Sequence, residues 1–227
     1  MKTHIITPTP NITASIAFYE DLQFSVTPYG NKHLATDGSA IIEIDPSRYT
    51  RAGIKIMTNS ANELIIELQK ITKVLQLENT YCLSDPSGTM IYISEEKTIE
   101  IEHQKKSSLL GNFAGLSLET VDPEKTMEIW NVIGFTKQTG SIDQGWVTLT
   151  DAQGLSVSIM KPNTCPHLFF NPSLTYFNGG SNLEIIQKVR LSGIPITEEI
   201  TYFNDKDIVD NIIIRDPGGY GFFIFND

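Results

Sequence analysis

The 227-residue sequence has few of the residues that build cross-links and common cofactor sites. Its two cysteines, Cys82 and Cys165, form no C-x-x-C pair, so we expect two buried thiols and neither a zinc knuckle nor a disulfide framework. A Gly-x-Ser-x-Gly motif and a phosphate-binding loop are both absent, which argues against a serine hydrolase and a nucleotide cofactor. His33, His103 and His167 each lack a second ligand or a triad partner at a useful spacing.

Basic residues and long apolar runs are also scarce. The chain has 17 Lys and Arg against 27 Asp and Glu, a formal net charge of −10 at pH 7, and no basic tract. Nucleic acids and anionic membranes would be repelled by this charge, so neither is an expected partner. The residues from Met1 to Ile6 lack the apolar segment of a signal peptide, and no run approaches the roughly 18 residues of a membrane span. A cytoplasmic location is the expectation.

The strongest positive feature is an internal repeat. Ser60-Ala-Asn-Glu63 precedes an apolar helical pattern that leads to Asp85-Pro-Ser-Gly88, and Ser181-Asn-Leu-Glu184 precedes a similar pattern that leads to Asp216-Pro-Gly-Gly219. The Ser and Glu spacing predicts a capping box at the start of each helix. Each Asp-Pro-x-Gly sequence predicts a tight turn between two strands. A repeated unit of this kind indicates two tandem domains of about 110 residues.

The remaining two units follow the same order of elements. Asn11 or Thr13 is the predicted N-cap of the first helix, and Asp122 followed by Pro123 is that of the third. Each unit is therefore expected to contain a strand, a helix and then about three strands. The predicted class is α+β, in which two βαβββ modules per domain form a curved, partly closed mixed sheet with helices on its outer face. The predicted domains are residues 1–104 and 113–227, joined by a linker at residues 105–112.

These features resemble the vicinal oxygen chelate superfamily, which includes glyoxalase I, the bleomycin-resistance proteins and the extradiol dioxygenases. The resemblance rests on His4, on the runs Ser15–Phe24 and Gly38–Ile44, and on both Asp-Pro-x-Gly turns. It covers nearly the whole chain and implies the tandem fold described above. It also implies where a metal would be held. Metal-dependent members bind a divalent cation through a His or Glu on the first strand and a Glu on the last strand of each unit.

Only His4 and Glu43 of this sequence match the metal-ligand positions of the family that it resembles. The second-unit positions fall near Gly53 and at Tyr92. A catalytic metal normally needs three protein ligands, so we expect no bound metal and a degenerate site. The alternative is a divalent cation (Zn, Ni, Fe or Mn) that loops outside this alignment help to bind. The corresponding positions in the second half of the chain are Gly115, Ser158, Leu174 and Phe223.

Strand alternation predicts a charged partner for Glu43. Gly53, Lys55 and Met57 share one face of a strand, and Gly53 stands at an inward ligand position of the resembling family. Lys55 is therefore expected to point toward His4 and Glu43, with its ammonium in place of the cation. A buried carboxylate without such a partner would be costly. The alternative is a solvated lysine at the rim of the sheet.

Aromatic residues stand at or beside the other inward positions. The predicted ligand-binding set is completed by Tyr92, Trp146, Tyr176 and Phe223. Together they predict a dry pocket for a small apolar or aromatic molecule, and the alternative is that they fill the core. No catalytic residue is assigned.

Three functions follow from these patterns. The preferred one is a metal-free small-molecule binding protein of the glyoxalase or bleomycin-resistance type. The others are a divalent-metal lyase, isomerase or dioxygenase, and a protein-interaction module without a ligand. Because one chain already contains both domains, a monomer is expected, with a weak homodimer as the alternative.

Overall fold

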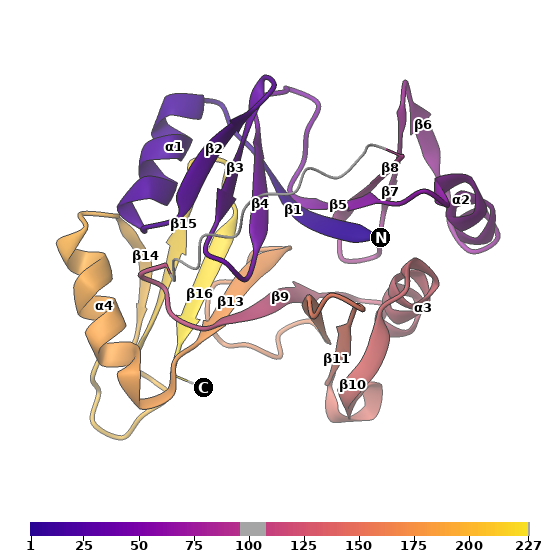
Figure 1. Ribbon diagram of the computed structural model, residues 1–227. Helices are drawn as coiled ribbons and strands as arrows, with labels where there is room; N and C mark the ends of the chain where they lie inside the picture. The colour runs from indigo at the N-terminus through magenta and orange to yellow at the C-terminus, as the bar shows by residue number, and fades with distance from the viewer. Residues whose placement is uncertain (96–107, 227) are drawn as a thin grey trace.

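The computed structural model describes residues 1–95 and 108–226, which form two eight-stranded mixed sheets (Figure 1). The first half contains β1 (Lys2–Pro8), α1 (Ile12–Asp21), β2 (Ser25–Tyr29), β3 (Lys32–Thr36), β4 (Ile41–Asp45), β5 (Gly53–Met57), α2 (Ala61–Gln69), β6 (Leu75–Leu77), β7 (Thr80–Ser84) and β8 (Met90–Ser94). The second half contains β9 (Phe113–Glu119), α3 (Pro123–Ile133), β10 (Thr136–Ser141), β11 (Trp146–Thr150), β12 (Ser156–Met160), β13 (Ser173–Phe177), α4 (Asn182–Leu191), β14 (Ile196–Ile200), β15 (Asn211–Arg215) and β16 (Gly221–Phe225).

The two sheets have the same topology. The strand order is β2-β3-β4-β1-β5-β8-β7-β6 in the first sheet and β10-β11-β12-β9-β13-β16-β15-β14 in the second. Each half therefore consists of two βαβββ units, and the predicted α+β class is confirmed. The first strand of each half lies in the middle of its sheet, where β1 pairs in parallel with β4 and antiparallel with β5. Within the described residues both sheets are open, because each ends in edge strands with one neighbour.

Two of the predicted helix starts are confirmed. The Asn11 side chain accepts a hydrogen bond from the Ala14 N–H at the start of α1. The Asp122 side chain accepts one from the Lys125 N–H at the start of α3, where Pro123 begins the helix. Each bond satisfies a backbone donor that has no partner inside the helix.

The two predicted capping boxes are wrong. Neither Ser60 nor Ser181 makes a side-chain cap hydrogen bond. A capping side chain needs an extended backbone at its own residue, whereas Ser60 has φ −106° and ψ 34°. Ser181 ends a 3₁₀ turn, Gly179–Ser181, that runs directly into α4, and its backbone is already helical.

Both Asp-Pro-x-Gly sequences form the predicted turns between strands. Gly88 lies between β7 and β8 with φ +87°, and Gly219 lies between β15 and β16 with φ +95°. These left-handed conformations favour glycine. The carboxylates of Asp85 and Asp216 accept hydrogen bonds from backbone N–H groups of their own turns.

The same carboxylates also join the two halves of the molecule. Asp37, Asp85, Asp151 and Asp216 occupy equivalent turns in the four units, and the second oxygen of each accepts a hydrogen bond from the other half. The donors are Tyr176 Oη to Asp37 (3.0 Å), Trp130 Nε1 to Asp85 (2.8 Å), Thr3 Oγ1 to Asp151 (3.2 Å), and Thr7 Oγ1 (2.7 Å) and Tyr19 Oη (2.9 Å) to Asp216. The repeated turn thus connects the halves and does not face a ligand site.

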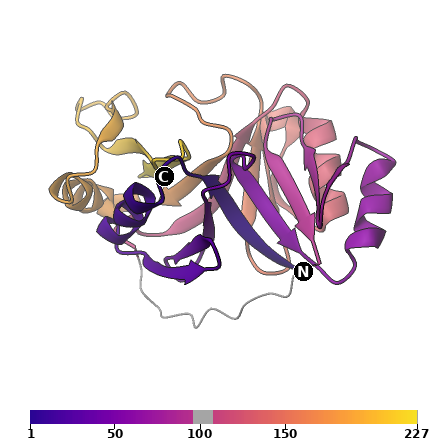
Figure 2. The ribbon, with the colours of Figure 1, turned by 90° about the horizontal axis from the view of Figure 1, so that it is seen from above.

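One continuous hydrophobic core extends through both halves. Side chains of all four helices share this core with the alternate strand residues Ile42, Ile44, Ile54 and Ile56. The helices therefore cover the sheet face opposite Glu43, and the two halves pack through that covered face. The ring of Phe222 from β16 lies 5.7 Å from Phe18 of α1. Figure 2 shows α2 and α3 side by side at one end of the molecule, with α1 and α4 at the other.

Part of the predicted linker is built into this core. Leu110 is fully buried, and the Leu109 N–H donates to the carbonyl of Leu22. The predicted boundary at residue 104, linker residues 105–107 and His103 lie outside the described residues. Among the described residues, no helix has both the length and the apolar character that crossing a membrane requires.

Candidate functional site

The uncovered face of the first sheet carries a group of charged residues. The strand register pairs Ile6 with Glu43, His4 with Lys55, and Lys55 with Tyr92. Paired residues and those two positions apart share a face. His4, Glu43, Lys55 and Tyr92 are therefore brought together on this face, as strand alternation predicts.

Glu43 is at the centre of the group and has no solvent exposure. Its Oε1 lies 2.5 Å from Lys32 Nζ, which also lies 2.8 Å from Asp45 Oδ2. Its Oε2 lies 3.6 Å from Lys55 Nζ and 3.8 Å from His4 Nδ1. The 3.8 Å separation is too long for a hydrogen bond, so the interaction between His4 and Glu43 is electrostatic only.

The charges in this group stabilise one another. Burial opposes ionisation of Glu43, but His4, Lys55 and Lys32 together lower its pKa to about 2. Burial also opposes the charge on Lys32, and its contacts with Asp45 and Glu43 outweigh that cost and raise its pKa. Glu43 and Lys32 are consequently both charged at neutral pH.

Sequence reasoning missed Lys32. It lies on β3, where the antiparallel register sets Leu34 opposite Glu43 and so places Lys32 on the same face. The alternation Lys32, Leu34, Thr36 was available as a signal, but the hairpin register that aligns it with Glu43 could not be read from the sequence.

A cleft of about 700 Å³ opens above this group. Lys32, Asp45, Lys55 and Tyr92 form part of its lining, and the Tyr92 hydroxyl accepts a hydrogen bond from the Arg51 N–H at 3.0 Å. The other lining residues are mainly polar: Ile6, Asn31, Ser47, Tyr49, Thr50, Gln76, Leu77, Glu78, Asn79 and Thr80.

The donors of this half do not fit a catalytic cation. Among residues 1–95 and 108–226, no group of three or more His, Cys, Asp or Glu side chains could hold a metal ion. His4 and Glu43 supply two donors, whereas a catalytic site normally has three. The ammonium of Lys32 already contacts the Glu43 carboxylate that a cation would need. We therefore derive no chemistry through a metal at this site.

The second sheet has uncharged residues at the four equivalent positions. Its register places Gly115, Ser158, Thr175 and Phe223 where the first sheet has His4, Glu43, Lys55 and Tyr92. Thr175 thus holds the position of Lys55, and Ser173 holds that of Gly53. The prediction that Leu174 corresponds to Gly53 is therefore wrong by one residue.

Tyr176 must be removed from the candidate site for the same reason. It points into the core between the halves, where its hydroxyl donates to Asp37 Oδ2 at 3.0 Å and its ring stacks on Phe222. Successive strand residues face opposite sides of a sheet, so Tyr176 cannot share a face with Thr175. Its predicted contact with a ligand is replaced by a contact that joins the halves.

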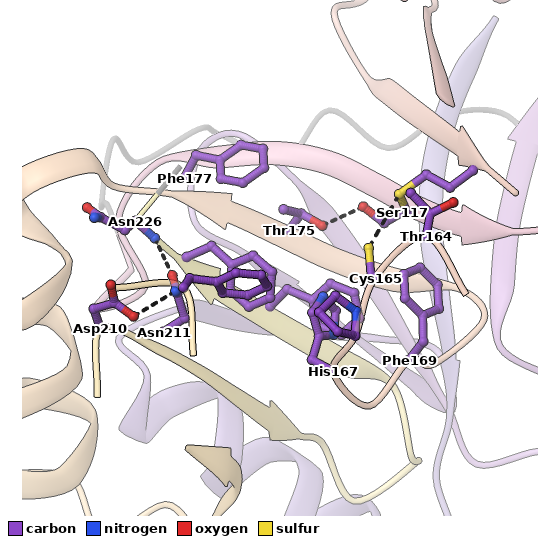
Figure 3. A pocket seen from close by; sticks show the side chains of 15 residues that line it. Ser117, Thr164, Cys165, His167, Phe169, Thr175, Phe177, Asp210, Asn211 and Asn226 are labelled. Carbon is purple, nitrogen blue, oxygen red and sulfur yellow. Dashed lines mark hydrogen bonds between the residues drawn. The ribbon is translucent and has the colours of Figure 1, made fainter. Parts of the chain in front are cut away.

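A cavity of about 490 Å³ lies on this face of the second sheet (Figure 3). The ring of His167 is surrounded by phenylalanines, with Phe223 and Phe225 both 4.9 Å from it and Phe169 stacked at 6.0 Å. Phe203 lies 6.5 Å away. The remaining lining residues are Ser117, Met160, Thr164, Cys165, Pro166, Thr175, Phe177, Asp210, Asn211 and Asn226.

Two predicted aromatic residues have different outcomes here. Phe223 is part of the cavity wall. Trp146 pairs with Met160, a lining residue, but it is 39% exposed and is not itself among the side chains that line the cavity. Sequence reasoning missed His167 and Phe169 because they lie on the connection between β12 and β13, whose path cannot be read from strand alternation. The apolar run from Pro166 to Phe170 was the available signal.

The fold is shared with a group of solved structures. No protein-family model matches this sequence, and a search of curated proteins finds no match. The 2,3-dioxygenase LapB from a Pseudomonas species matches 97% of this chain and 89% of its own, with a TM-score of 0.60 and 14% identity. A 2,2′,3-trihydroxybiphenyl 1,2-dioxygenase from Sphingomonas wittichii matches 99% of this chain and 91% of its own, with a TM-score of 0.57 and 13% identity.

A third match broadens the comparison beyond dioxygenases. The Mn(II)-bound glyoxalase from Novosphingobium aromaticivorans matches 97% of this chain and 79% of its own, with a TM-score of 0.56 and 14% identity. These similarities establish that the chain shares its tandem fold with these dioxygenases and this glyoxalase, as the resemblance in the sequence implies. Identities this low describe the fold and do not transfer an activity.

Proposed function

We propose that this protein is a metal-free small-molecule binding protein, and that the second-half cavity binds a flat apolar or aromatic molecule. The observation that carries the proposal is an open cavity lined by several phenylalanines. It lies on the sheet face where members of the family that the sequence resembles bind their ligands. The four positions there that correspond to His4, Glu43, Lys55 and Tyr92, namely Gly115, Ser158, Thr175 and Phe223, lack a charge.

The size and lining of the cavity suit such a ligand. Its volume of about 490 Å³ falls within the range of small-molecule pockets. Aromatic side chains offer large apolar contact and favour stacked or edge-to-face contact with a second ring. A molecule with one or two fused rings would replace water against Phe169, Phe223 and Phe225.

The proposal is tested by titrating the purified protein with naphthalene and following tryptophan fluorescence or calorimetric heat. We expect saturable binding at one site per chain. Phe203→Ala at the exposed side of the cavity, and Phe223→Leu in its wall, should each weaken binding about tenfold, which corresponds to about 1.4 kcal/mol. Tyr49→Ala, which removes an aromatic ring from the cleft of the first half, is the matched control and should leave the affinity unchanged. An effect of Tyr49→Ala alone would place the ligand in the wrong half and overturn the assignment.

The dioxygenase and glyoxalase matches give a second candidate function, a divalent-metal enzyme. Elemental analysis of protein purified without chelator separates the two. The binding protein should contain well below one equivalent of metal, and EDTA should leave naphthalene binding unchanged. About one equivalent of iron, manganese, nickel or zinc, together with loss of binding in EDTA, would favour the metal enzyme and overturn the proposal.

The proposed form of the protein is a cytoplasmic monomer. The two halves already cover each other's helical faces within one chain through the shared core. Sedimentation equilibrium at micromolar concentration should give the monomer mass, and a dimer mass would contradict this part of the proposal.

A further inference from the structure

The orientation of His167 fixes which of its nitrogens can meet a ligand. Its Nδ1 lies 2.8 Å from the carbonyl oxygen of Leu168. A carbonyl can only accept a hydrogen bond, so Nδ1 must carry the proton. In the neutral ring, Nε2 is then a hydrogen-bond acceptor.

Nε2 is the second nitrogen of a ring that lines the cavity. It has no hydrogen-bond partner among the described residues. It is also not fully buried, so solvent reaches it. His167 as a whole is only 7% exposed, and its ring lines the cavity. Phenylalanines surround the His167 ring, so the accessible nitrogen is a polar atom in an apolar part of the cavity lining.

Most neighbouring polar groups are already occupied. The hydroxyls of Ser117 and Thr175 bond to each other at 2.7 Å. The Asn211 amide donates to Asp210 Oδ1, and its oxygen accepts from the Asn226 N–H. Asp210 adds a carboxylate to the lining, and the described lining contains neither Lys nor Arg. The cavity is therefore supplied with acceptors and lacks a cation that would compensate an anionic ligand.

We propose that this cavity selects uncharged aromatic molecules that carry an O–H or N–H donor, as phenols and indoles do, and that the donor binds His167 Nε2. This inference rests on the proposed function and narrows its ligand class. A carboxylate-bearing ring is disfavoured, because it would lack a donor for Nε2 and would bring a second negative charge near Asp210. A hydrogen bond between neutral groups contributes about 1 kcal/mol, which predicts roughly fivefold selectivity.

The test compares 2-naphthol, 2-methoxynaphthalene and 2-naphthoate at pH 8. We expect the naphthol to bind about fivefold more tightly than the methoxy compound, and the naphthoate to bind most weakly. His167→Phe keeps a planar ring in the wall but removes the acceptor. This variant should bind 2-methoxynaphthalene about as well as the wild type does and should lose the preference for 2-naphthol.

The outcomes separate this inference from the proposed function. Equal affinity of the wild type for the naphthol and the methoxy compound, or a preference that survives in His167→Phe, would overturn the inference and leave the binding function standing. Binding of none of the three would overturn both. Should His167→Phe fail to fold, the ¹⁵N spectrum of the wild-type imidazole decides. A proton on Nδ1 and a shift of Nε2 on adding 2-naphthol support the proposal, whereas a proton on Nε2 refutes it.

Discussion

Replacing Lys32 by methionine should destabilise the protein strongly, although the residue is partly exposed. The substitution keeps most of the side-chain length and removes the ammonium that contacts Glu43 and Asp45. Lys55 remains at 3.6 Å from Glu43, but Asp45 loses the ammonium that lies 2.8 Å from its Oδ2. The variant thus has two buried carboxylates that are poorly compensated.

The magnitude follows from the burial of the partners. Removing one member of a buried ion pair costs about 3–5 kcal/mol, most of it the penalty of the charge left behind. The Glu43 side chain has no exposure and that of Asp45 only 5%, but the Lys32 side chain is 23% exposed and its charge is partly solvated. We therefore expect a loss at the lower end, about 3 kcal/mol.

The assay is urea unfolding at pH 7, followed by circular dichroism. Adding Glu43→Gln to Lys32→Met should recover part of the loss, because the amide has no charge to compensate. Lys70→Met is the matched control, since Lys70 pairs with Glu67 on the exposed surface of α2. Such surface pairs contribute about 0–1 kcal/mol. If Lys32→Met unfolds at the same urea concentration as Lys70→Met, the charged group does not stabilise the fold and the reasoning fails.

Two further predictions concern the same interactions. Because the folded-state pKa of Glu43 is about 2 against an ordinary value of 4.5, its contribution should be fully present above about pH 4.5 and be lost as the pH falls toward 2. That loss of folding free energy, on the order of 3 kcal/mol, should be visible in unfolding curves of the wild type measured at decreasing pH. The Glu43→Gln variant should not show it. Equal acid sensitivity of the wild type and Glu43→Gln would contradict the prediction. Tyr19→Phe removes one of the two side-chain donors to Oδ2 of buried Asp216 and should cost about 1–2 kcal/mol. Tyr49→Phe, at an 89% exposed residue, should cost nothing measurable by thermal unfolding, and equal midpoints for the two variants would refute the role of the buried bond.

The fold could be predicted because the sequence repeats its turns and its alternation. The Asp-Pro-x-Gly turns mark the same point in two units, and each is followed by a strand as predicted, Met90–Ser94 and Gly221–Phe225. Grouping Lys55 with Glu43 needed the two-residue period of a strand and the inward position that the family resemblance gives to Gly53. The capping boxes failed because their pattern specifies residue types, whereas the cap needs a backbone conformation that the preceding chain sets.

The rest of the site depends on information that alternation does not contain. The contact between Lys32 and Glu43 depends on hairpin register. Tyr176 was assigned to the wrong face because a one-residue error in register reverses every side chain of a strand. The register between β9 and β13 does shift at this point, between Thr175 and Tyr176. His167 was missed because a long connection brings it over the sheet, and loop paths leave no period in a sequence.

The two halves differ in the charge at their inward positions, and this difference is the reason for placing the proposed ligand in the second half. In the first half a carboxylate remains at the inward position and Lys32 neutralises it internally, so a ligand there would compete with an ion pair that already stabilises the fold. In the second half Ser158 and Thr175 replace the charged pair, and no such competition exists. A neutral ring entering the second cavity displaces water and breaks no ion pair among the described residues that line it. We therefore expect the first half to contribute stability and the second half to bind the proposed ligand.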